Sequence, residues 1–511
     1  MALARTYSVA LMGLDGSVVE VEADISSNLP AIVLIGLPDA ALAEARDRVR
    51  AAAANSGCPL TGRKLTINLS PAALPKHGSG FDLAIALASL AAAGDVSAQS
   101  VESVVHLGEL GLDGRLRPMA GILPSVLAAA RAGRNKIMVP AGNAHEAALV
   151  PDITVIPVAG LRDAAIWHGG QFDPIPVEPL LVAESPNETS TDYDLAEVIG
   201  NDDAVSALQI AAAGGHHMFL LGPPGAGKTM LAERLPSVLP DLDETAALEA
   251  TSIRSLSGQP IGSHLVVRPP LEAPHHTATA AAIIGGGSGR IRPGAAVRAS
   301  HGVLFLDEAP EFASAVLDVL RQPLESGRIS IHRANGVAHF PGRFQLVMAA
   351  NPCPCGQYGT SDNECTCTPS ARRRYLGRLS GPLMDRIDIR LTLRRVTATQ
   401  LRMADGEQRL TSEAARARVV DARAAARERL RGTPWMTNGQ VSGSWLRAPA
   451  RRIGHRAITG LDRALERGTI TMRGYDRTLR LAWTIADIDG ADRPSAEHVG
   501  TALYLRKGMI P

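Results

Sequence analysis

The sequence predicts an α/β protein in which two α/β units are followed by a helical one. Residues 1–176 alternate short apolar runs with Ala-rich stretches of helical spacing, which is the pattern of strands alternating with helices. Residues 193–396 repeat this alternation around a glycine-rich turn, and residues 397–511 are rich in Arg and Ala with helical spacing alone. Because single hydrophobic cores stop growing near about 250 residues, a chain of this length divides into several domains.

The elements of each unit follow from these periods. In the first unit, strands are expected at Thr66–Leu69, Ile137–Pro140 and Ile153–Pro157, and helices at Ala40–Ala54, Asp82–Ala93 and Ser125–Ala132. Residues 177–192 are rich in Pro, Ser, Thr and acidic residues without an apolar period, so we expect a linker there. The second unit should open with a helix at Asp203–Ala213 and a strand at Met218–Leu221. The third should hold helices at Ala414–Leu430, Asp462–Arg467, Tyr475–Ile488 and Ala496–Leu505.

Composition limits the function classes. The formal net charge of +1, with 20% charged residues, excludes a protein that binds nucleic acid through a global basic field, so any such contact must be local. The longest apolar run, Leu83–Gly94, is too short to cross a bilayer. We therefore expect a soluble, cytoplasmic protein with no membrane partner.

A phosphate-binding loop follows the strand at Met218–Leu221. The run is Gly222-Pro223-Pro224-Gly225-Ala226-Gly227-Lys228-Thr229, and it precedes a helical stretch, as a P-loop requires. Its glycines let backbone N–H groups close on the phosphates of ATP, Lys228 reaches the β and γ phosphates, and the Thr229 hydroxyl ligates Mg²⁺. The alternative is a glycine turn with a surface lysine, but the next lysines along the chain are as distant as Lys136 and Lys507.

Polar side chains end two further apolar runs. Asp307 and Glu308 follow the run Val303–Leu306; Asp307 is expected to hold Mg²⁺ and Glu308 to polarise the attacking water. Asn351 follows the run Gln345–Ala350, and its amide is a candidate sensor of the γ phosphate. A strand ending at a polar turn, and a turn Asn before a proline, are the respective alternatives.

Four of the five cysteines crowd into residues 353–367 as two C-x-C pairs, Cys353 with Cys355 and Cys365 with Cys367. In a chain without a secretory signal such pairs indicate a metal rather than disulfides. A tetrahedral Zn²⁺ would cross-brace the loop that follows Asn351. Reduced, packed cysteines and a redox switch are the alternatives.

Several long motifs resemble the YifB/ComM family of Mg-chelatase-like AAA+ proteins, and the resemblance covers nearly the whole chain. The motifs are LIGLPDAALAEARDRVRAA, INLSPAALPKHGSGFDLAIALA, APHHTATAAAIIGGGSGRIRPG, VLFLDEAPEF, NPCPCG and LSGPLMDRIDI. The resemblance implies a Lon-protease-like (ribosomal S5 domain 2-like) N-terminal domain at 1–176. It also implies an AAA+ core of the helix-2-insert class at 193–396 and a chelatase-type helical lid at 397–511.

The same resemblance implies roles for two arginines. Ring-forming AAA+ proteins stabilise the charge of phosphoryl transfer with an arginine from the neighbouring subunit, and Arg386 matches that finger. A surface ion pair with Asp385 or Asp388 is the alternative. Arg473, at the start of a lid helix, matches a second phosphate contact.

The run GELGLDGRLRPMAGILPSVLAAARAGRNKIMVP resembles the Lon proteolytic segment, but it departs from it at the catalytic pair. Leu123 stands where Lon proteases place the lysine, and Gly80 stands where they place the serine, with Ser79 one residue early. Without a base there is no route to an activated serine. We therefore expect a scaffold for assembly or partner binding, not a protease.

Two basic loops are the candidates for DNA contact. A glycine-rich stretch from Ile283 to Gly294 carries Arg290 and Arg292, and glycines give it conformational freedom while arginines bind phosphates. Around an Asn-Gly turn, Ile329–His339 predicts a hairpin with Arg333 near its tip, and it resembles the pre-sensor hairpin of the MCM motors. Exposed turns with solvated arginines are the alternative for both.

The resemblance implies a hexameric, ATP-driven DNA helicase that promotes branch migration in recombination during natural transformation. Its expected partners are single-stranded and branched DNA. A magnesium-chelatase motor acting on a porphyrin through partner subunits, and a protein-remodelling chaperone, are the alternatives. Unwinding of forked DNA, metalation of a porphyrin, and ATPase stimulation by unfolded protein would separate the three.

Overall fold

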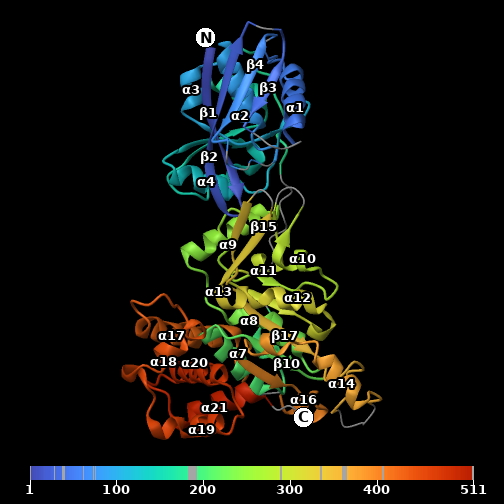
Figure 1. The fold of residues 1–511 in the computed structure, drawn as a ribbon, viewed down its shortest axis with the longest axis vertical. Helices are drawn as coiled ribbons and strands as arrows, with labels where there is room; N and C mark the ends of the chain where they lie inside the picture. The colour runs from blue at the N-terminus through green and yellow to red at the C-terminus, as the bar shows by residue number, and fades with distance from the viewer. Residues whose placement is uncertain are drawn as a thin grey trace.

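The computed structural model describes residues 2–508 except residues 28, 37–40, 61, 73, 75, 77, 182–192, 288–290, 334–335, 360–364 and 405–407. The chain is elongated, with an N-terminal domain at one end, an α/β core in the middle, and a helical C-terminal domain beside and below that core (Figure 1). Most of the expected linker at 177–192 lies outside the described residues.

The N-terminal domain is a seven-stranded sheet of strand order β3-β4-β2-β1-β5-β8-β9. Its strands are β1 (Ala2–Met12), β2 (Asp15–Ser26), β3 (Ile32–Ile35), β4 (Lys64–Ser70), β5 (Val105–His106), β8 (Lys136–Pro140) and β9 (Thr154–Val158), with a separate short pair β6 (Glu109–Leu110) and β7 (Leu116–Arg117). Its helices are α1 (Ala41–Asn55), α2 (Asp82–Ala93), α3 (Ala98–Glu102), α4 (Ile122–Arg131), α5 (Ala144–Ala147) and α6 (Leu161–Trp167). The expected α/β alternation is confirmed.

The longest element of this domain is the β1–β2 hairpin, which the periodicity did not predict. Its strands pair antiparallel from Ala2 opposite Ile25 to Met12 opposite Asp15. One face of the sheet is covered by α2, whose side chains are nearly all buried, and the other by α4. The tight turn between Met12 and Asp15 is the tip of the hairpin.

A parallel five-stranded sheet of order β11-β14-β17-β10-β18 forms the core. Its strands are β10 (Met218–Leu221), β11 (Leu271–Glu272), β14 (Val303–Leu306), β17 (Gln345–Ala350) and β18 (Ile389–Thr392). Two hairpins stand apart from it, β12 (Gly285–Gly286) with β13 (Arg292–Pro293), and β15 (Arg328–Arg333) with β16 (Gly336–Pro341). The helices are α7 (Asp202–Gly214), α8 (Lys228–Val238), α9 (Glu244–Leu256), α10 (Ala280–Ile284), α11 (Ala295–Arg298), α12 (Ser314–Asp318), α13 (Pro323–Ser326), α14 (Pro369–Leu376) and α15 (Gly381–Met384).

The C-terminal domain is helical in its described part. Its helices are α16 (Ala398–Met403), α17 (Ser412–Arg429), α18 (Gly443–Leu446), α19 (His455–Glu466), α20 (Met472–Ile488) and α21 (Ala496–Lys507). Successive strand residues face opposite sides of the core sheet, so Leu220 packs against the helical domain while Leu221 packs against the other face. The core and the helical domain therefore share one hydrophobic core.

The N-terminal domain contacts the core at two places. Helix α4 packs on α9, where the N–H of Gly121 donates to the carbonyl of Ser255, and the Ser255 hydroxyl donates to the buried carboxylate of Glu146. At the tip of the β1–β2 hairpin, Gly13 forms a bridge to His339 of β16. No helix in the ranges described above is both long and apolar enough to cross a membrane.

A buried histidine pair makes the stability of the N-terminal domain depend on pH. The Nε2 atoms of His106 and His168 are 2.9 Å apart, and burial lowers the pKa of His106 and lowers that of His168 to about 4. In the unfolded chain both histidines bind a proton near pH 6.5, whereas in the folded domain they stay neutral at that pH. The free energy of unfolding therefore falls as the pH drops from about 6.5 towards 4. Urea unfolding at several pH values should show this loss. The loss of stability at low pH should be smaller in His168→Asn. It should be unchanged in the control His145→Asn, which removes an exposed histidine.

Candidate nucleotide-binding site

The glycine-rich loop lies between the buried strand β10 and helix α8. Gly225 and Gly227 have φ of +77° and +85°, a left-handed backbone that suits glycine and that turns the chain sharply into the helix. Gly227 is the N-cap residue of α8, which starts at Lys228, so the backbone N–H groups of the first helical turn are available to phosphate oxygens.

Lys228 connects this loop with the end of a second strand. Its ammonium donates to the carbonyls of Gly222 (2.7 Å) and Pro223 (3.0 Å) and to Oδ1 of Asn351 (3.1 Å). Burial lowers the pKa of Lys228, and the carboxylates of Asp307 and Glu308 oppose that shift. Lys228 and Asn351, 123 positions apart in the sequence, therefore meet at one place.

The magnesium ligands expected from the sequence also meet. Because β10, β17 and β14 are parallel neighbours, their carboxyl ends lie at one edge of the sheet. There the Thr229 hydroxyl donates to Oδ2 of Asp307 at 2.9 Å. A hydroxyl and a carboxylate oxygen are the hard ligands that Mg²⁺ takes beside water and phosphate, so these residues fit that ion.

Glu308 has an unusual backbone. Its φ is +50°, and its N–H donates to Oδ1 of Asp307 at 2.9 Å. A non-glycine residue in the left-handed region costs about 1–2 kcal/mol. The surrounding structure therefore holds the Glu308 backbone in a conformation that this residue would otherwise avoid. Its carboxylate is half-exposed and lies 3.2 Å from Nδ1 of His276.

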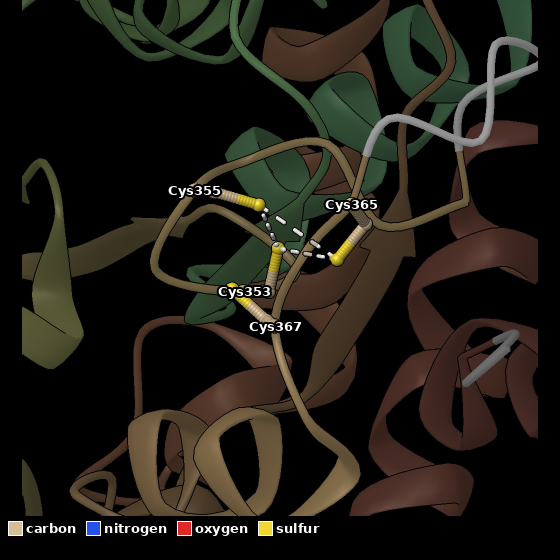
Figure 2. A group of neighbouring side chains, drawn as sticks. All are labelled: Cys353, Cys355, Cys365 and Cys367. Carbon is tan, nitrogen blue, oxygen red and sulfur yellow. Dashed lines mark hydrogen bonds between the residues drawn. The ribbon is translucent and has the colours of Figure 1, made fainter.

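The four clustered cysteines come together, as Figure 2 shows. All four Sγ atoms lie within 4.8 Å of one another. Sγ of Cys365 is 3.7 Å from both Cys353 and Cys355, which are themselves 3.3 Å apart. A tetrahedral Zn²⁺ with Zn–S bonds of about 2.3 Å places its sulfurs about 3.8 Å apart, so the cluster fits that ion.

The cysteine loop touches the P-loop. A Cβ placed on Gly356 would lie 2.8 Å from the ring of Pro224, so the backbone at Gly356 packs closely against that ring. Arg395 connects them, since it donates to the carbonyl of Pro224 at 3.2 Å and to the side chain of Gln357 at 3.3 Å. The order of the cysteine loop is therefore linked to the order of the P-loop.

Within the described part of the chain, Arg386 and Arg473 form no hydrogen bond or ion pair with the nucleotide-binding residues. Arg386 follows α15, is buried, and pairs with Glu325 while donating to the carbonyl of Pro382. The alternative for Arg386, an ion pair within the chain, is present but with Glu325 in place of Asp385 or Asp388. Asp388 pairs with Arg477. Arg473 is exposed in the first turn of α20.

The basic loops form hairpins. β15 and β16 pair from Arg328 opposite Pro341 to Arg333 opposite Gly336, so the expected hairpin is confirmed. Arg333 ends β15, and its side chain lies outside the described part. Arg292 is exposed in the β12–β13 hairpin, and Arg290 lies outside the described residues.

Leu123 and Ser79, which lie at or next to the positions of the Lon catalytic pair, have other contacts in this domain. Leu123 is buried in α4, and its N–H donates to Glu146 at 2.9 Å. Ser79 donates to Glu109, while the buried ammonium of Lys76 donates to backbone carbonyls at Gly36, Pro71 and Leu74. The sequence reasoning gave Lys76 and Glu109 no role, because nothing local in the sequence indicates these long-range contacts.

A parallel sheet with a P-loop after one strand and Mg²⁺-binding carboxylates after its near neighbour defines a P-loop ATPase. Three family models match: "Magnesium chelatase, subunit ChlI" over residues 194–401, "Subunit ChlI of Mg-chelatase" over 21–143, and "Magnesium chelatase, subunit ChlI C-terminal" over 409–506. An uncharacterised Mycobacterium tuberculosis protein is 49% identical over 508 residues, 99% of both chains.

Competence protein ComM of Haemophilus influenzae is 38% identical over 508 residues, 99% of this chain and 98% of that protein. A Lon protease of Salinispora arenicola is 32% identical over 171 residues, 31% of this chain and 20% of that protein. The chain belongs to the YifB/ComM family of magnesium-chelatase-like AAA+ ATPases. That family implies ATP and Mg²⁺ as cofactors.

Proposed function

We propose that this protein is a hexameric, ATP-driven DNA motor that promotes branch migration in recombination during natural transformation. One observation carries the proposal. The β15–β16 hairpin, in which Arg333 is the last residue of β15, leads through three residues into β17, and the residue after β17 is Asn351, which contacts Lys228. A change at the γ phosphate therefore has a short covalent path to the hairpin. The likeness to a competence protein over nearly the whole chain supports this reading.

In this proposal the DNA lies along the β12–β13 and β15–β16 hairpins. Arg290, Arg292 and Arg333 neutralise backbone phosphates, which gives binding without sequence preference. Aromatic residues are only 3% of the chain, so stacking on bases contributes little.

Assembly completes the nucleotide site in this proposal. Arg386 of one subunit reaches the ATP of its neighbour, and Arg473 adds a contact from the helical lid. In this chain Glu325 holds Arg386. Ring formation must therefore exchange that carboxylate for the phosphate of the adjacent subunit.

The deciding experiment measures the ATPase rate with no DNA, with single-stranded DNA and with a branched junction, together with branch migration of a labelled four-way junction. Stimulation by DNA and ATP-dependent migration are expected. Stimulation by unfolded protein alone would indicate a remodelling chaperone, and metal insertion into a porphyrin with partner subunits would indicate a chelatase motor.

The four-cysteine cluster is part of the proposal as a structural zinc site. We expect about one Zn²⁺ per chain in protein purified without chelators. Replacement of Cys353 and Cys355 by Ser should remove the metal, because two thiolates cannot hold a tetrahedral site. Since the loop touches Pro224, ATP affinity should weaken too. Elemental analysis is the measurement, Cys58→Ser is the matched control, and metal-free wild-type protein would exclude the site.

A further inference from the structure

The β15–β16 hairpin depends on packing from outside itself. It is a two-stranded sheet that stands apart from the five-stranded sheet of the core. A lone two-stranded hairpin is at best marginally stable in water, so it needs an apolar face buried against other elements. Ile329, Ile331, Ala338 and Phe340 form that face, pair with one another across the two strands, and are all buried. The elements that cover this face therefore decide how firmly the hairpin is held.

Part of that support comes from the N-terminal domain. The β1–β2 hairpin points from that domain towards β15 (Figure 1), and Gly13 at its tip forms a bridge to His339 of β16. Leu11, Met12 and Leu14, on either side of Gly13, pack against the apolar cluster of the core that contains the buried face of the β15–β16 hairpin. Two domains therefore support the hairpin that is proposed to hold DNA.

The fit at Gly13 leaves no room for a side chain. Gly13 is buried and has a φ of +68°. A Cβ at this position would lie 2.8 Å from the carbonyl oxygen of His339, and 3.4 Å from the side chains of Ala338 and Phe340. Glycine is therefore needed here for two reasons, the left-handed backbone and the close approach of the two chain segments.

The β1–β2 hairpin is a stiff support. Strand β1 pairs with β2 along its whole length of 11 residues, and both strands belong to the seven-stranded sheet of the N-terminal domain. The same domain is attached to the core at a second place, where Gly121 and Glu146 bond with Ser255 of α9. A force on the β15–β16 hairpin is therefore transmitted to a sheet that is anchored elsewhere on the core.

The contact lies between the tip of the β15–β16 hairpin and the strand that leads to the nucleotide site. His339 is opposite Ser330 in the register of the hairpin, whereas Arg333 is opposite Gly336 at the tip. After β16 the chain passes through three residues into β17, which is followed directly by Asn351. The β1–β2 hairpin therefore contacts β16 along the path that connects Arg333 with Asn351.

We propose that the β1–β2 hairpin of the N-terminal domain braces the β15–β16 hairpin against the pull of bound DNA. The inference rests on the proposed function, because it gives the N-terminal domain a part in the same motor. A braced hairpin keeps its shape, so a shift at the end of β17 reaches the DNA held at Arg333. Without the brace, the two-stranded hairpin bends, and ATP is hydrolysed without an equal movement of DNA.

The test compares Gly13→Ala with Gly94→Ala in the assembled full-length protein. Both variants place an alanine at a left-handed glycine of the N-terminal domain, but the Cβ position of Gly94 (φ +84°) is open, so Gly94→Ala has the strain without the clash. In Gly13→Ala, the ATP hydrolysed per step of branch migration should rise about three- to tenfold, with the DNA-free kcat within about twofold of the wild type. Gly94→Ala should match the wild type in both.

A second measurement needs no DNA. Hydrogen exchange followed by mass spectrometry should show faster exchange of the β15–β16 amides in Gly13→Ala than in the wild type or Gly94→Ala. A pair of truncations repeats the comparison without a strained backbone. The double variant Met12→Ser/Leu14→Ser should behave like Gly13→Ala, whereas Leu3→Ser, at the exposed far end of β1, should behave like the wild type. Met12→Leu/Leu14→Ile should retain wild-type coupling.

Wild-type exchange of the β15–β16 amides in Gly13→Ala overturns the proposal. So does an equal loss of coupling in Gly13→Ala and Gly94→Ala, or wild-type coupling in a Gly13→Ala protein whose hairpin exchanges faster. If the wild type neither responds to DNA nor migrates junctions, the proposed function fails. The support of the hairpin is then still judged by its hydrogen exchange, so the two failures are distinguishable.

Discussion

Replacing Lys228 by alanine is expected to abolish ATP binding. The ammonium is the cation at the centre of the loop, and Gly222, Pro223 and Asn351 already orient it. Removing it takes away the charge that meets the β and γ phosphates and leaves these acceptors without their donor. Equilibrium titration with a fluorescent ATP analogue should show no saturable binding. An affinity equal to that of the wild type would contradict the nucleotide-site assignment.

Glu308→Gln should separate binding from hydrolysis. The amide keeps the shape of the side chain but cannot take a proton from water, so ATP affinity should stay near the wild-type value while the hydrolysis rate falls about 10²- to 10⁴-fold. Glu311→Gln is the matched control. Glu311 lies three residues away and pairs with Arg378, so its variant should hydrolyse ATP at nearly the wild-type rate.

The core was predictable because its strands are buried on both faces and end at chemically distinctive residues. β10 and β17 have the bounds that the apolar runs indicated, Met218–Leu221 and Gln345–Ala350. A continuous apolar run marks a buried parallel strand, and glycines or carboxylates mark its end. The contacts among Lys228, Thr229, Asp307 and Asn351 then follow from strand order.

Elements that depend on long-range pairing were not predictable. The β1–β2 hairpin is a different case, because it is local and residues Val19–Ile25 of β2 alternate apolar and acidic side chains, the period of a strand with one buried face. β11 has only two residues, and its pairing with β14 is what places His276 over Glu308. The paired histidines appear in the sequence as APHHTATAAAIIGGG, but that motif gives no clue to their partner.

The contact between the N-terminal domain and the core could not be predicted from the sequence either. Glu146 reads as a surface acid on a short helix, yet it is buried and accepts from Leu123 and from Ser255 of the core. Burial raises its pKa, while these hydrogen bonds oppose the shift. Such a carboxylate is tolerated only because its partners come from both domains.

Arg333→Ala is expected to uncouple ATP hydrolysis from DNA movement. Arg333 ends β15, and the chain continues through β16 and three residues into β17, which is followed directly by Asn351. A guanidinium at that position can hold a backbone phosphate through its planar set of donors. Arg333 lies in the sequence outside the P-loop, Asp307, Glu308 and Asn351, so the DNA-free ATPase rate should stay within about twofold of the wild type. Branch migration should fall at least about tenfold, and the salt dependence of DNA binding should flatten.

Arg328→Ala is the control that tests whether the position of the arginine on the hairpin matters. Arg328 begins the same strand and is exposed at the opposite end of the hairpin, next to Pro341 in the register. If a positive charge anywhere on the hairpin were enough to hold DNA, Arg328→Ala and Arg333→Ala would reduce branch migration equally. If only the tip meets DNA, Arg328→Ala should migrate junctions at nearly the wild-type rate. Both activities should be measured on one preparation of assembled protein, and wild-type branch migration in Arg333→Ala would make Arg333 an ordinary solvated turn residue.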